Sequence, residues 1–184
     1  QALNATVDDL LVFARPRSPR PGPVPLLPLL RATASLLNRD PTVGAVQLEF
    51  PAADVMLSAD PELLKPVFLN LLLNAAQAMG GRGTIRVAAQ ARDGMCKVSI
   101  ADEGPGIPPE LRERVLEPFF TTKHRGTGLG LAIARRVVEA HGGTLRLECP
   151  PRGGTTVTVT LPTSREAAAA PAGPGVGESS ARPA

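Results

Sequence analysis

The sequence predicts an α+β fold in which helices cover one face of a mixed β-sheet as a two-layer sandwich. Two observations lead to this class. Segments with apolar residues at helical spacing are followed by pairs of short segments in which every second residue is apolar. Glycines also gather near both ends of one long connection, residues 102–131, which we call the lid segment. Such glycines suit a segment that changes position over a bound ligand.

Three helices are expected within the main domain, residues 24–162, and they span 26–37, 61–79 and 129–141. In the first, apolar residues recur every three or four positions from Leu26 onward. The second is predicted to start at Asp60 as N-cap, with Pro61 at the first helical position. Glycine pairs at 80–81 and 142–143 end the second and third helices.

Six segments are predicted to be strands, over residues 43–50, 54–57, 84–91, 95–101, 144–149 and 155–161. In the first of them Val46, Leu48 and Phe50 alternate with other residues, as expected for a half-buried strand. Cys96 and Cys149 fall within two of these strands. Because no Cys-x-x-Cys or Cys/His cluster accompanies them, we expect two buried free thiols.

The two ends of the chain differ from this domain. Residues 1–15 place Leu3, Val7 and Leu10 on one face of an amphipathic helix, followed by a proline-rich linker at 16–23. The apolar face must pack against a partner helix, for example on a second subunit, or back onto the domain, and the sequence leaves both open. Residues 163–184 are rich in alanine, proline and glycine and are predicted to be disordered.

Composition disfavours two classes of function. The 184 residues carry a formal charge of only +3, without aromatic and basic residues interleaved, which is poor support for nucleic-acid binding. No apolar run approaches the roughly 20 residues of a membrane-spanning helix, and no signal peptide is recognisable. We therefore expect a cytoplasmic location, with any membrane attachment in segments upstream of this sequence.

A polar stripe interrupts the apolar helix at 61–79. Asn70 and Asn74 are four residues apart and Gln77 continues the same face one turn later. Buried amides destabilise a fold unless they are hydrogen-bonded, so the stripe should meet either neighbouring loops or a ligand. Amide oxygens are suitable ligands for Mg²⁺, which also keeps waters and substrate phosphates around it. The residues alone leave the two interpretations evenly matched.

The lid segment begins with Asp102, followed by Gly104 and Gly106. A carboxylate at the end of a strand can accept a hydrogen bond from the exocyclic amine of adenine, and the glycines let a base approach the backbone. Any acidic turn after a strand looks similar, so this signal is weak by itself. Further along, Phe119 and Phe120 look buried and would anchor the segment or simply pack in the core, while Lys123 could reach phosphate oxygens.

The lid segment ends in Gly126-Thr127-Gly128-Leu129-Gly130-Leu131, which runs directly into a predicted helix. Backbone amides at a helix N-terminus form a site for anions such as phosphate. The pattern is not Gly-x-Gly-x-x-Gly after a first strand, which disfavours a dinucleotide-binding fold, and no Gly-Lys pair indicates a P-loop.

In this order, the four stretches resemble the N, G1, F and G2 boxes of the GHKL ATPase superfamily. The resemblance is closest to the catalytic ATP-binding domain of sensor histidine kinases of the nitrogen-regulation-like branch. It rests on NLLLNAAQAM, EPFFTTK and GTGLGLAI, and it covers Val24 to Pro162. Residues 1–15 resemble the last helix of the dimerisation and phosphotransfer domain of that family.

The resemblance implies a Bergerat fold with an ATP lid, and it implies ATP and Mg²⁺ as cofactors. Asn74 would hold the metal, Asp102 would recognise adenine, and Asn74 and Lys123 are the implied catalytic residues. The implied ATP-binding residues are Asn70, Asn74, Gln77, Asp102, Gly104, Gly106, Ile107, Phe120, Thr121, Lys123, Gly126, Thr127, Gly128, Leu129, Gly130, Leu131 and Thr155.

The function implied is transfer of the ATP γ-phosphate to a histidine and then to a response-regulator receiver domain. The family forms homodimers through a helix bundle. His124 and His141 are the two histidines, and neither has the sequence context of the phosphoacceptor, which we therefore expect outside this sequence. Two alternatives remain, a GHKL serine kinase of the anti-sigma type and a nucleotide-binding module without catalytic activity.

Two positions depart from the family pattern. Gln77 stands where many relatives carry lysine, so neutralisation of phosphate charge should depend more on Lys123, together with Arg125. Ala78 stands where some relatives carry an aromatic residue that stacks on adenine.

Overall fold

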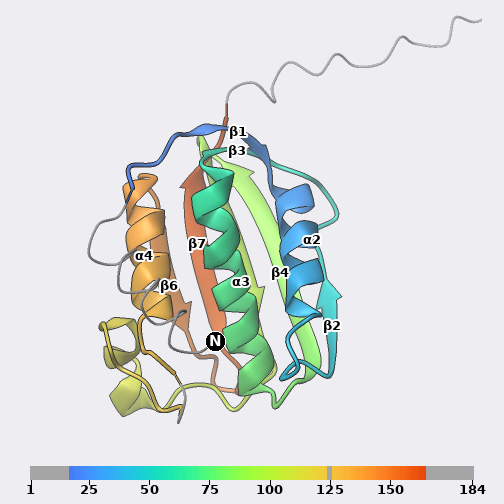
Figure 1. Cartoon of the computed structure of the whole chain (residues 1–184), viewed down its shortest axis with the longest axis vertical. Coiled ribbons are helices and arrows are strands. Elements are labelled where there is room, and N and C mark those ends of the chain that lie inside the picture. Colours follow the sequence, from blue (N-terminus) through green and yellow to red (C-terminus); the bar gives the residue numbers. More distant parts are fainter. Residues whose placement is uncertain (1–16, 124–125, 165–184) are drawn as a thin grey trace, which may run out of the picture.

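The computed structural model describes residues 17–123 and 126–164, arranged as a layer of helices over a sheet (Figure 1). The strands are β1 Gly22–Pro25, β2 Ala45–Glu49, β3 Met56–Ala59, β4 Arg82–Arg92, β5 Met95–Ala101, β6 Thr144–Glu148 and β7 Thr156–Pro162. The α-helices are α2 Leu26–Leu37, α3 Pro61–Ala78 and α4 Gly130–Ala140, and the lid segment contains two short 3-10 helices, η1 Pro109–Leu111 and η2 Arg114–Leu116. The predicted helix at 1–15 and most of the predicted tail lie outside the described residues.

The main sheet has five strands in the order β2-β4-β5-β7-β6. β2 pairs with β4 in parallel, and the other three pairings are antiparallel. The register sets Leu145, Val159 and Val98 side by side across three strands, and all three are buried. Directly opposed residues share one face of a sheet, so this row forms part of the surface on which the helices pack. The predicted mixed sheet is confirmed.

Helices cover one face of the sheet, as the sequence predicts (Figure 1). Within β5, Cys96, Val98 and Ile100 are buried while Lys97 between them is exposed. From the helix side, Phe68 and Leu72 of α3 are fully buried in the same core. A core of leucine, valine and isoleucine is consistent with the low aromatic content of the chain, 3%.

A second, two-stranded sheet was not predicted. β1 pairs antiparallel with β3, so Gly22 and Pro23, expected in the linker, form part of the domain. Proline has no N–H to donate, which suits the edge position that β1 occupies. β3 also lies two residues later than predicted. The reason is Asp54, whose Oδ1 accepts hydrogen bonds from the N–H groups of Leu27 and Val55, both at 2.8 Å, and so forms a turn.

The domain also extends slightly beyond its predicted end. Thr163 donates its N–H to the Gly94 carbonyl at 2.9 Å, and Ser164 donates to the Met56 carbonyl at 2.9 Å. These two residues were expected in the disordered tail, and they belong to the domain instead. These bonds join the end of the domain to the turn between β4 and β5 and to β3.

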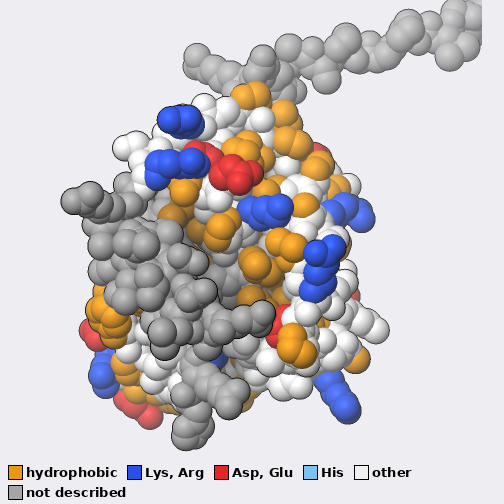
Figure 2. All heavy atoms as spheres, in the orientation of Figure 1, with side chains coloured by type: hydrophobic (Ala, Val, Ile, Leu, Met, Phe, Trp, Pro, Cys, Tyr) orange, Lys and Arg blue, Asp and Glu red, His pale blue; other side chains and the backbone are white. Residues whose placement is uncertain are grey.

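The expectation of two buried thiols is half right. Both cysteines are free, but only Cys96 is buried. Cys149 lies one residue beyond β6, where the chain turns into two prolines, and it is partly exposed. In the parts of the chain that the structure describes, no helix is both long and apolar enough to cross a membrane. Figure 2 shows Lys and Arg side chains spread over the visible part of the helix face, interspersed with hydrophobic ones.

One end of the helix layer is tied together by Asp60, the N-cap of α3. Its N–H donates to His141 Nε2 at 3.0 Å, and His141 Nδ1 lies 2.8 Å from the Val137 carbonyl of α4. The carboxylate accepts from the backbone N–H of Arg20 at 3.1 Å and from the Arg17 guanidinium at 3.3 Å. These contacts, with the Arg20 N–H as the main cause, lower the pKa of Asp60 although burial opposes them.

Candidate functional site

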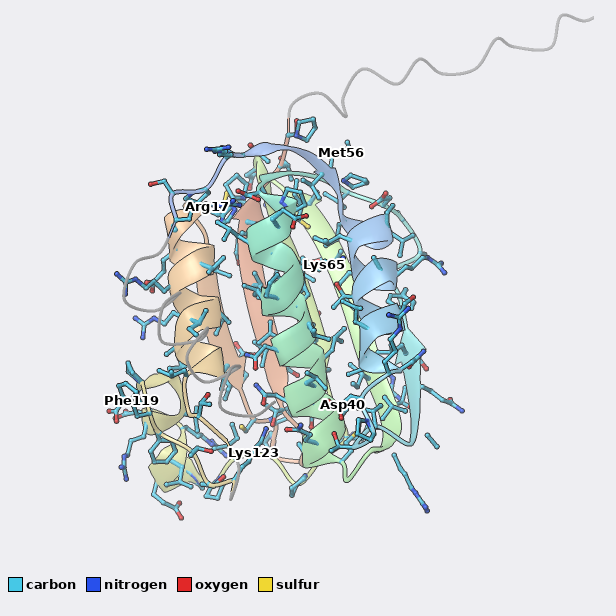
Figure 3. All side chains as sticks on the ribbon, viewed as in Figure 1. Arg17, Asp40, Met56, Lys65, Phe119 and Lys123 are labelled. Carbon is cyan, nitrogen blue, oxygen red and sulfur yellow. The ribbon has the colours of Figure 1, made fainter. Side chains whose placement is uncertain are left out.

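Lys123 and the polar stripe of α3 meet at the other end of the helix layer, far from Arg17 (Figure 3). The Lys123 ammonium donates to Asn74 Oδ1 and to Gln77 Oε1, in both cases at 2.7 Å. Asn74 and Gln77 are three positions apart, so their side chains project from neighbouring turns of one face. The two amide oxygens therefore converge on one cation, which the neighbouring lid segment supplies.

Asn70 completes this stripe on the side of α4. Its Oδ1 accepts a long hydrogen bond, 3.5 Å, from Asn74 Nδ2. Its Nδ2 is buried and has no hydrogen-bond partner among the described residues. A buried donor without a partner costs about 1–3 kcal/mol. The unsatisfied amide therefore indicates a place where a ligand with acceptor oxygens would be stabilised.

Gly130 makes this arrangement possible. It is the first residue of α4, and a Cβ built on it would collide with Asn70 Oδ1. A side chain at this position would therefore separate the N-terminus of α4 from the stripe. The first turn of α4 has no side-chain cap, so its amides remain available to an anion.

Lys123 is accessible along its stem, but its ammonium lies against α3. Burial of this end lowers the pKa of Lys123. Among the described residues it has no carboxylate partner within ion-pair distance. Its backbone N–H donates to Thr121 Oγ1 at 3.1 Å, which fixes the turn that directs the side chain toward α3. A lysine paired only with neutral amides is free to prefer a phosphate when one is present.

Asp102 lies at the end of β5, as predicted. Its Oδ1 accepts from the N–H groups of Gly104 at 2.8 Å and Thr155 at 3.2 Å, and its own N–H donates to the Thr155 carbonyl at 2.9 Å. Burial raises the pKa of Asp102, although the two N–H donors act in the opposite direction. Both bonds use Oδ1, so within the described residues Oδ2 is the oxygen open to a ligand's donor.

The turn before β7 closes tightly over Asp102. Gly154 donates its N–H to the Gly104 carbonyl at 2.7 Å. Its φ is +80°, and a Cβ built on it would collide with the Asp102 carbonyl oxygen. Only glycine meets both conditions. The predicted contribution of Thr155 therefore depends on the preceding glycine, which brings the Thr155 N–H to the carboxylate.

The middle of the lid segment differs from the prediction at Phe119. Phe119 is 61% exposed and has a φ of +67°, because its N–H donates to the Gly128 carbonyl at 3.0 Å and turns the ring outward. The expectation that both phenylalanines are buried is therefore wrong for Phe119. Phe120 is partly buried and packs beneath the Arg114 guanidinium, 4.5 Å from the ring centroid, a cation–π contact within the lid segment.

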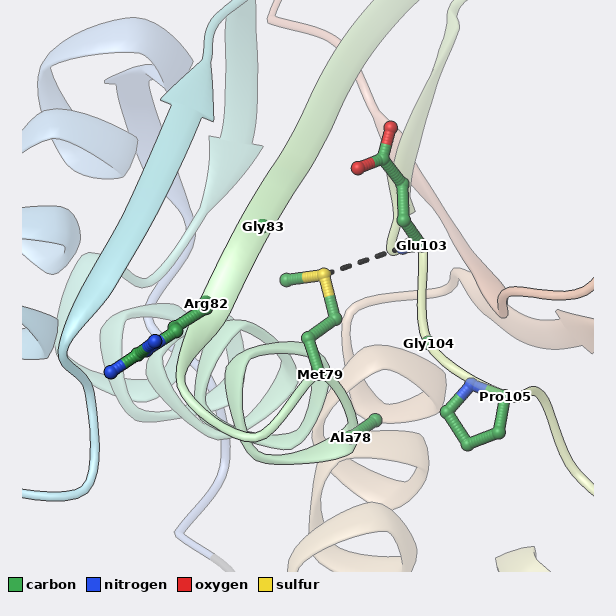
Figure 4. Close-up of a pocket in the computed structure, with 7 residues that line it drawn as sticks. All are labelled: Ala78, Met79, Arg82, Gly83, Glu103, Gly104 and Pro105. Atoms are coloured by element: carbon green, nitrogen blue, oxygen red, sulfur yellow. Dashed lines mark hydrogen bonds between the residues drawn. The ribbon is translucent and has the colours of Figure 1, made fainter.

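The Asp102 turn and the polar stripe adjoin each other along α3. A Cβ built on Gly104 would lie 3.2 Å from the Ala78 side chain, so the Asp102 turn abuts the residue that follows Gln77. A cavity of about 340 Å³ opens beside this contact (Figure 4), lined by Ala78, Met79, Arg82, Gly83, Glu103, Gly104 and Pro105. One helix face therefore runs from the Asp102 turn to the stripe.

Met79 is a residue of this region that the sequence did not single out. Its sulfur accepts from the Glu103 N–H at 3.4 Å, which holds the chain next to Asp102 against the end of α3 (Figure 4). Its position directly after Gln77 and Ala78, two residues that the sequence did single out, could have indicated that it belongs to this region. Apolar residues are so frequent in α3, however, that nothing distinguished this one.

Comparison with known proteins identifies the family to which this chain belongs. A family model described as "Histidine kinase-, DNA gyrase B-, and HSP90-like ATPase" matches residues 59–165, more than half of the chain. The chain belongs to this ATPase family. The match includes α3, the lid segment and β7, which supply the stripe, the lysine and the Asp102 turn.

Relatives within this ATPase family are sensor histidine kinases. Sensor histidine kinase ZraS of Klebsiella oxytoca is 40% identical over 163 residues, which cover 87% of this chain and 35% of that protein. The chain thus spans about a third of the length of this curated relative.

Solved structures of histidine kinases share the fold of this family member. Full-length ShkA in complex with AMPPNP matches with a TM-score of 0.76 and 30% identity over 88% of this chain and 36% of that chain. Histidine kinase ThkA in complex with the response regulator protein TrrA matches with a TM-score of 0.71 and 28% identity over 89% and 48%. The predicted fold class and the predicted family are both confirmed.

The remaining predicted residues lie in the lid segment. Ile107 is partly buried, and its carbonyl accepts from the Arg112 side chain at 3.0 Å, which joins the start of the lid segment to η1. Thr127 Oγ1 accepts from the Leu129 N–H at 3.3 Å, just before α4. Other members occupy the turns already described or the first turn of α4, namely Gly106, Gly126, Gly128 and Leu131.

The donors present are compatible with a magnesium ion. Asn74 Oδ1 and Gln77 Oε1 already attract a cation, the Lys123 ammonium. Within the described residues no cluster of three or more Asp, Glu, His or Cys side chains could hold a metal alone. Mg²⁺ prefers oxygen ligands and keeps waters and substrate phosphates in its octahedron, so Asn74 Oδ1 would supply a protein oxygen and the phosphates would supply the negative charge.

Proposed function

We propose that this chain is the ATP-binding catalytic part of a sensor histidine kinase, which transfers the γ-phosphate of ATP to a histidine outside this sequence. The observation that carries the proposal is the convergence of Asn74, Gln77 and Lys123 beside the open N-terminus of α4. Cation-attracting oxygens, a lysine and free amides at one place form the set needed to bind a triphosphate with its metal.

Recognition of the base is proposed for Asp102. Oδ1 is held by two backbone N–H groups, which leaves Oδ2 to accept the exocyclic amine of adenine. Burial raises the pKa of Asp102, and a donor from the base would stabilise the charged form that burial disfavours, which supports this role. A guanine base presents a carbonyl oxygen at the corresponding position, and the carboxylate would repel it.

Catalysis by this chain would depend on positioning and charge. We propose that Asn74 holds Mg²⁺ through Oδ1, and that Lys123 and the amides of residues 126–131 bind phosphate oxygens. Bound Mg²⁺ would neutralise charge that develops on the phosphates during transfer. Asn70, with its unsatisfied Nδ2, would donate to a phosphate oxygen or to a water of the metal.

The acceptor is proposed to lie outside this sequence. Both ring nitrogens of His141 are engaged, one by the Asp60 N–H and one by the Val137 carbonyl, and the residue is buried. His141 is therefore unsuited to receive a phosphoryl group, and His124 lies outside the described residues.

The partners are proposed from the relatives. By analogy with ThkA in complex with the response regulator protein TrrA, a receiver domain would take the phosphoryl group from the histidine. We also propose a homodimer, formed through the helix bundle of the full-length protein, and a cytoplasmic location, where ATP is available.

The acceptor chemistry tests this proposal. The 184-residue chain should bind an ATP analogue but should not label itself with phosphate from ATP. The full-length protein should become labelled with phosphate that is lost in acid and stable in alkali, as expected for phosphohistidine. Acid-stable label would instead indicate the serine kinase alternative. Binding without any labelling would indicate the nucleotide-binding module, and acid-labile label on His141 of this chain would contradict the proposed acceptor.

A further inference from the structure

We propose that Lys123 and Gln77 form a latch that occupies the metal-binding oxygen of Asn74 until a nucleotide with its metal displaces the lysine. The inference rests on the proposed function, since it concerns how the same site passes from its ligand-free to its ligand-bound arrangement. It goes further by giving Gln77 a role of its own, that of a positioning residue for Lys123.

The latch is defined by two short hydrogen bonds. The Lys123 ammonium lies 2.7 Å from Asn74 Oδ1 and 2.7 Å from Gln77 Oε1. Charge-assisted hydrogen bonds of this length are stronger than bonds between neutral groups. Within the described residues Lys123 has no carboxylate partner that could take over from these amides. Gln77 therefore supplies one of the two contacts that keep the lysine on α3.

The lysine and the metal exclude each other at Asn74. A magnesium ion binds an oxygen at about 2.1 Å. With the ammonium 2.7 Å from the same Oδ1, the two cations would lie within roughly 5 Å of each other, with no carboxylate between them. Their repulsion makes simultaneous binding unfavourable. Metal entry therefore requires Lys123 to leave Asn74, and the phosphates that arrive with the metal offer the lysine a stronger partner.

The chemistry of Gln77 determines how firmly the latch holds. A glutamine oxygen attracts the ammonium, whereas a cationic side chain at this position would repel Lys123 and free Asn74. The Gln77 side chain is exposed, and within the described residues its hydrogen bond is to Lys123. The geometry thus gives Gln77 an effect on nucleotide binding that passes through Lys123 and opposes metal entry.

A spectrum of the lysine side chains tests the contact directly. The chain contains three lysines, Lys65, Lys97 and Lys123, so labelling lysine with ¹³C and ¹⁵N gives three sets of side-chain signals. In the ligand-free protein, Gln77→Leu should shift the Lys123 Cε signal and leave the other two unchanged. Gln47→Leu, at an exposed glutamine of β2 that pairs with Thr84, is the matched control and should shift none of the three. An unchanged Lys123 signal in Gln77→Leu would overturn the latch.

The magnesium requirement of AMPPNP binding tests the exchange. Gln77→Leu should lower the Mg²⁺ concentration for half-maximal binding by roughly two- to tenfold, the range for loss of one accessible hydrogen bond, and Gln47→Leu should not change it. Weaker AMPPNP binding in Gln77→Leu at saturating Mg²⁺ would mean that Gln77 contacts the nucleotide itself, and an unchanged requirement would mean that no exchange occurs. Either result overturns the latch alone. Failure of the wild-type chain to bind AMPPNP at any Mg²⁺ concentration would overturn the proposed function as well.

Discussion

The Asn70 side chain lies against the backbone of Gly130, and this contact joins the polar stripe of α3 to the first turn of α4. The two helices thereby form one continuous surface with amide oxygens on one side and free backbone N–H groups on the other. The oxygens of this surface suit a cation and the N–H groups suit an anion, so a metal ion and a phosphate could bind next to each other there.

Replacement of Gly130 by alanine should damage both stability and binding. The new Cβ would collide with Asn70 Oδ1, and an overpacked contact of this kind costs about 1–3 kcal/mol of the free energy of unfolding. We expect weaker AMPPNP binding by calorimetry and a lower denaturation midpoint. Gly22→Ala is the matched control, since nothing lies within 4 Å of a Cβ there and its φ is ordinary. Equal effects of the two substitutions would contradict the proposed contact.

Asp102→Asn should reduce preference for adenine. The amide loses the charge that strengthens a hydrogen bond from the base, so affinity for AMPPNP should fall about ten- to hundredfold, and the margin over a guanine analogue should narrow. Binding of both analogues to wild type and variant by calorimetry measures this. An unchanged ratio between the two bases would show that Asp102 does not read the base.

The pH dependence of binding should also depend on Asp102. Burial raises its pKa in the free protein, and a donor from the base favours the charged form. Affinity should therefore fall as the pH drops into the range of the raised pKa. The nucleotide also titrates, but it does so equally with both proteins. The ratio of the wild-type affinity to the Asp102→Asn affinity at each pH therefore isolates the contribution of Asp102. Parallel pH profiles would contradict the assignment.

The same shift has a defined sign for stability. The folded-state pKa of Asp102 lies above its unfolded value, so the folded protein binds the proton more tightly. The stabilisation that protonation gives is complete below the unfolded pKa and is lost as the pH rises through the folded pKa. The free energy of unfolding, measured by denaturation across the acidic range, should therefore contain a decline with rising pH that comes from Asp102. This decline should be absent in Asp102→Asn.

Asp60 should behave in the opposite way. Its pKa is lowered, chiefly by the Arg20 N–H, so its contribution to stability is present above the unfolded pKa and is lost as the pH falls through the folded pKa. Asp60→Ala removes the N-cap of α3 and should lower the free energy of unfolding by about 1–2 kcal/mol at neutral pH. Asp60→Asn keeps a side chain that can cap the helix, so it should be more stable than Asp60→Ala. Its free energy of unfolding should no longer fall in acid through this residue, because the amide does not titrate. Denaturation by urea at several pH values measures both.

Much of the fold could be predicted because its periodicities are strong. The spacing of leucines gives α2 without error, and Asp60 with Pro61 marks the start of α3. β1 escaped prediction because its stability comes from pairing with β3, a long-range contact, whereas its own sequence, Gly-Pro-Val-Pro, does not favour a strand. The position of β3 was missed for a related reason, since the Asp54 turn depends on N–H groups from two different segments.

The site was predictable in its members but not in their contacts. Motif order identified Asn74, Gln77 and Lys123, yet their hydrogen bonds depend on how the lid segment folds over α3. Phe119 was wrongly expected to be buried because hydrophobicity says nothing of a backbone in the left-handed region, which here turns the ring outward.

The central claim is that Asn74 binds the metal that accompanies ATP. Calorimetry of AMPPNP binding, with Mg²⁺ and with EDTA, tests it most directly in wild type, Asn74→Ala and Asn38→Ala, the last a control at the exposed C-cap of α2. We predict that wild type and Asn38→Ala bind at least about tenfold more tightly with Mg²⁺, and that Asn74→Ala loses this difference. Equal affinity with and without Mg²⁺ in wild type, or an undiminished effect of Mg²⁺ in Asn74→Ala, would contradict the account.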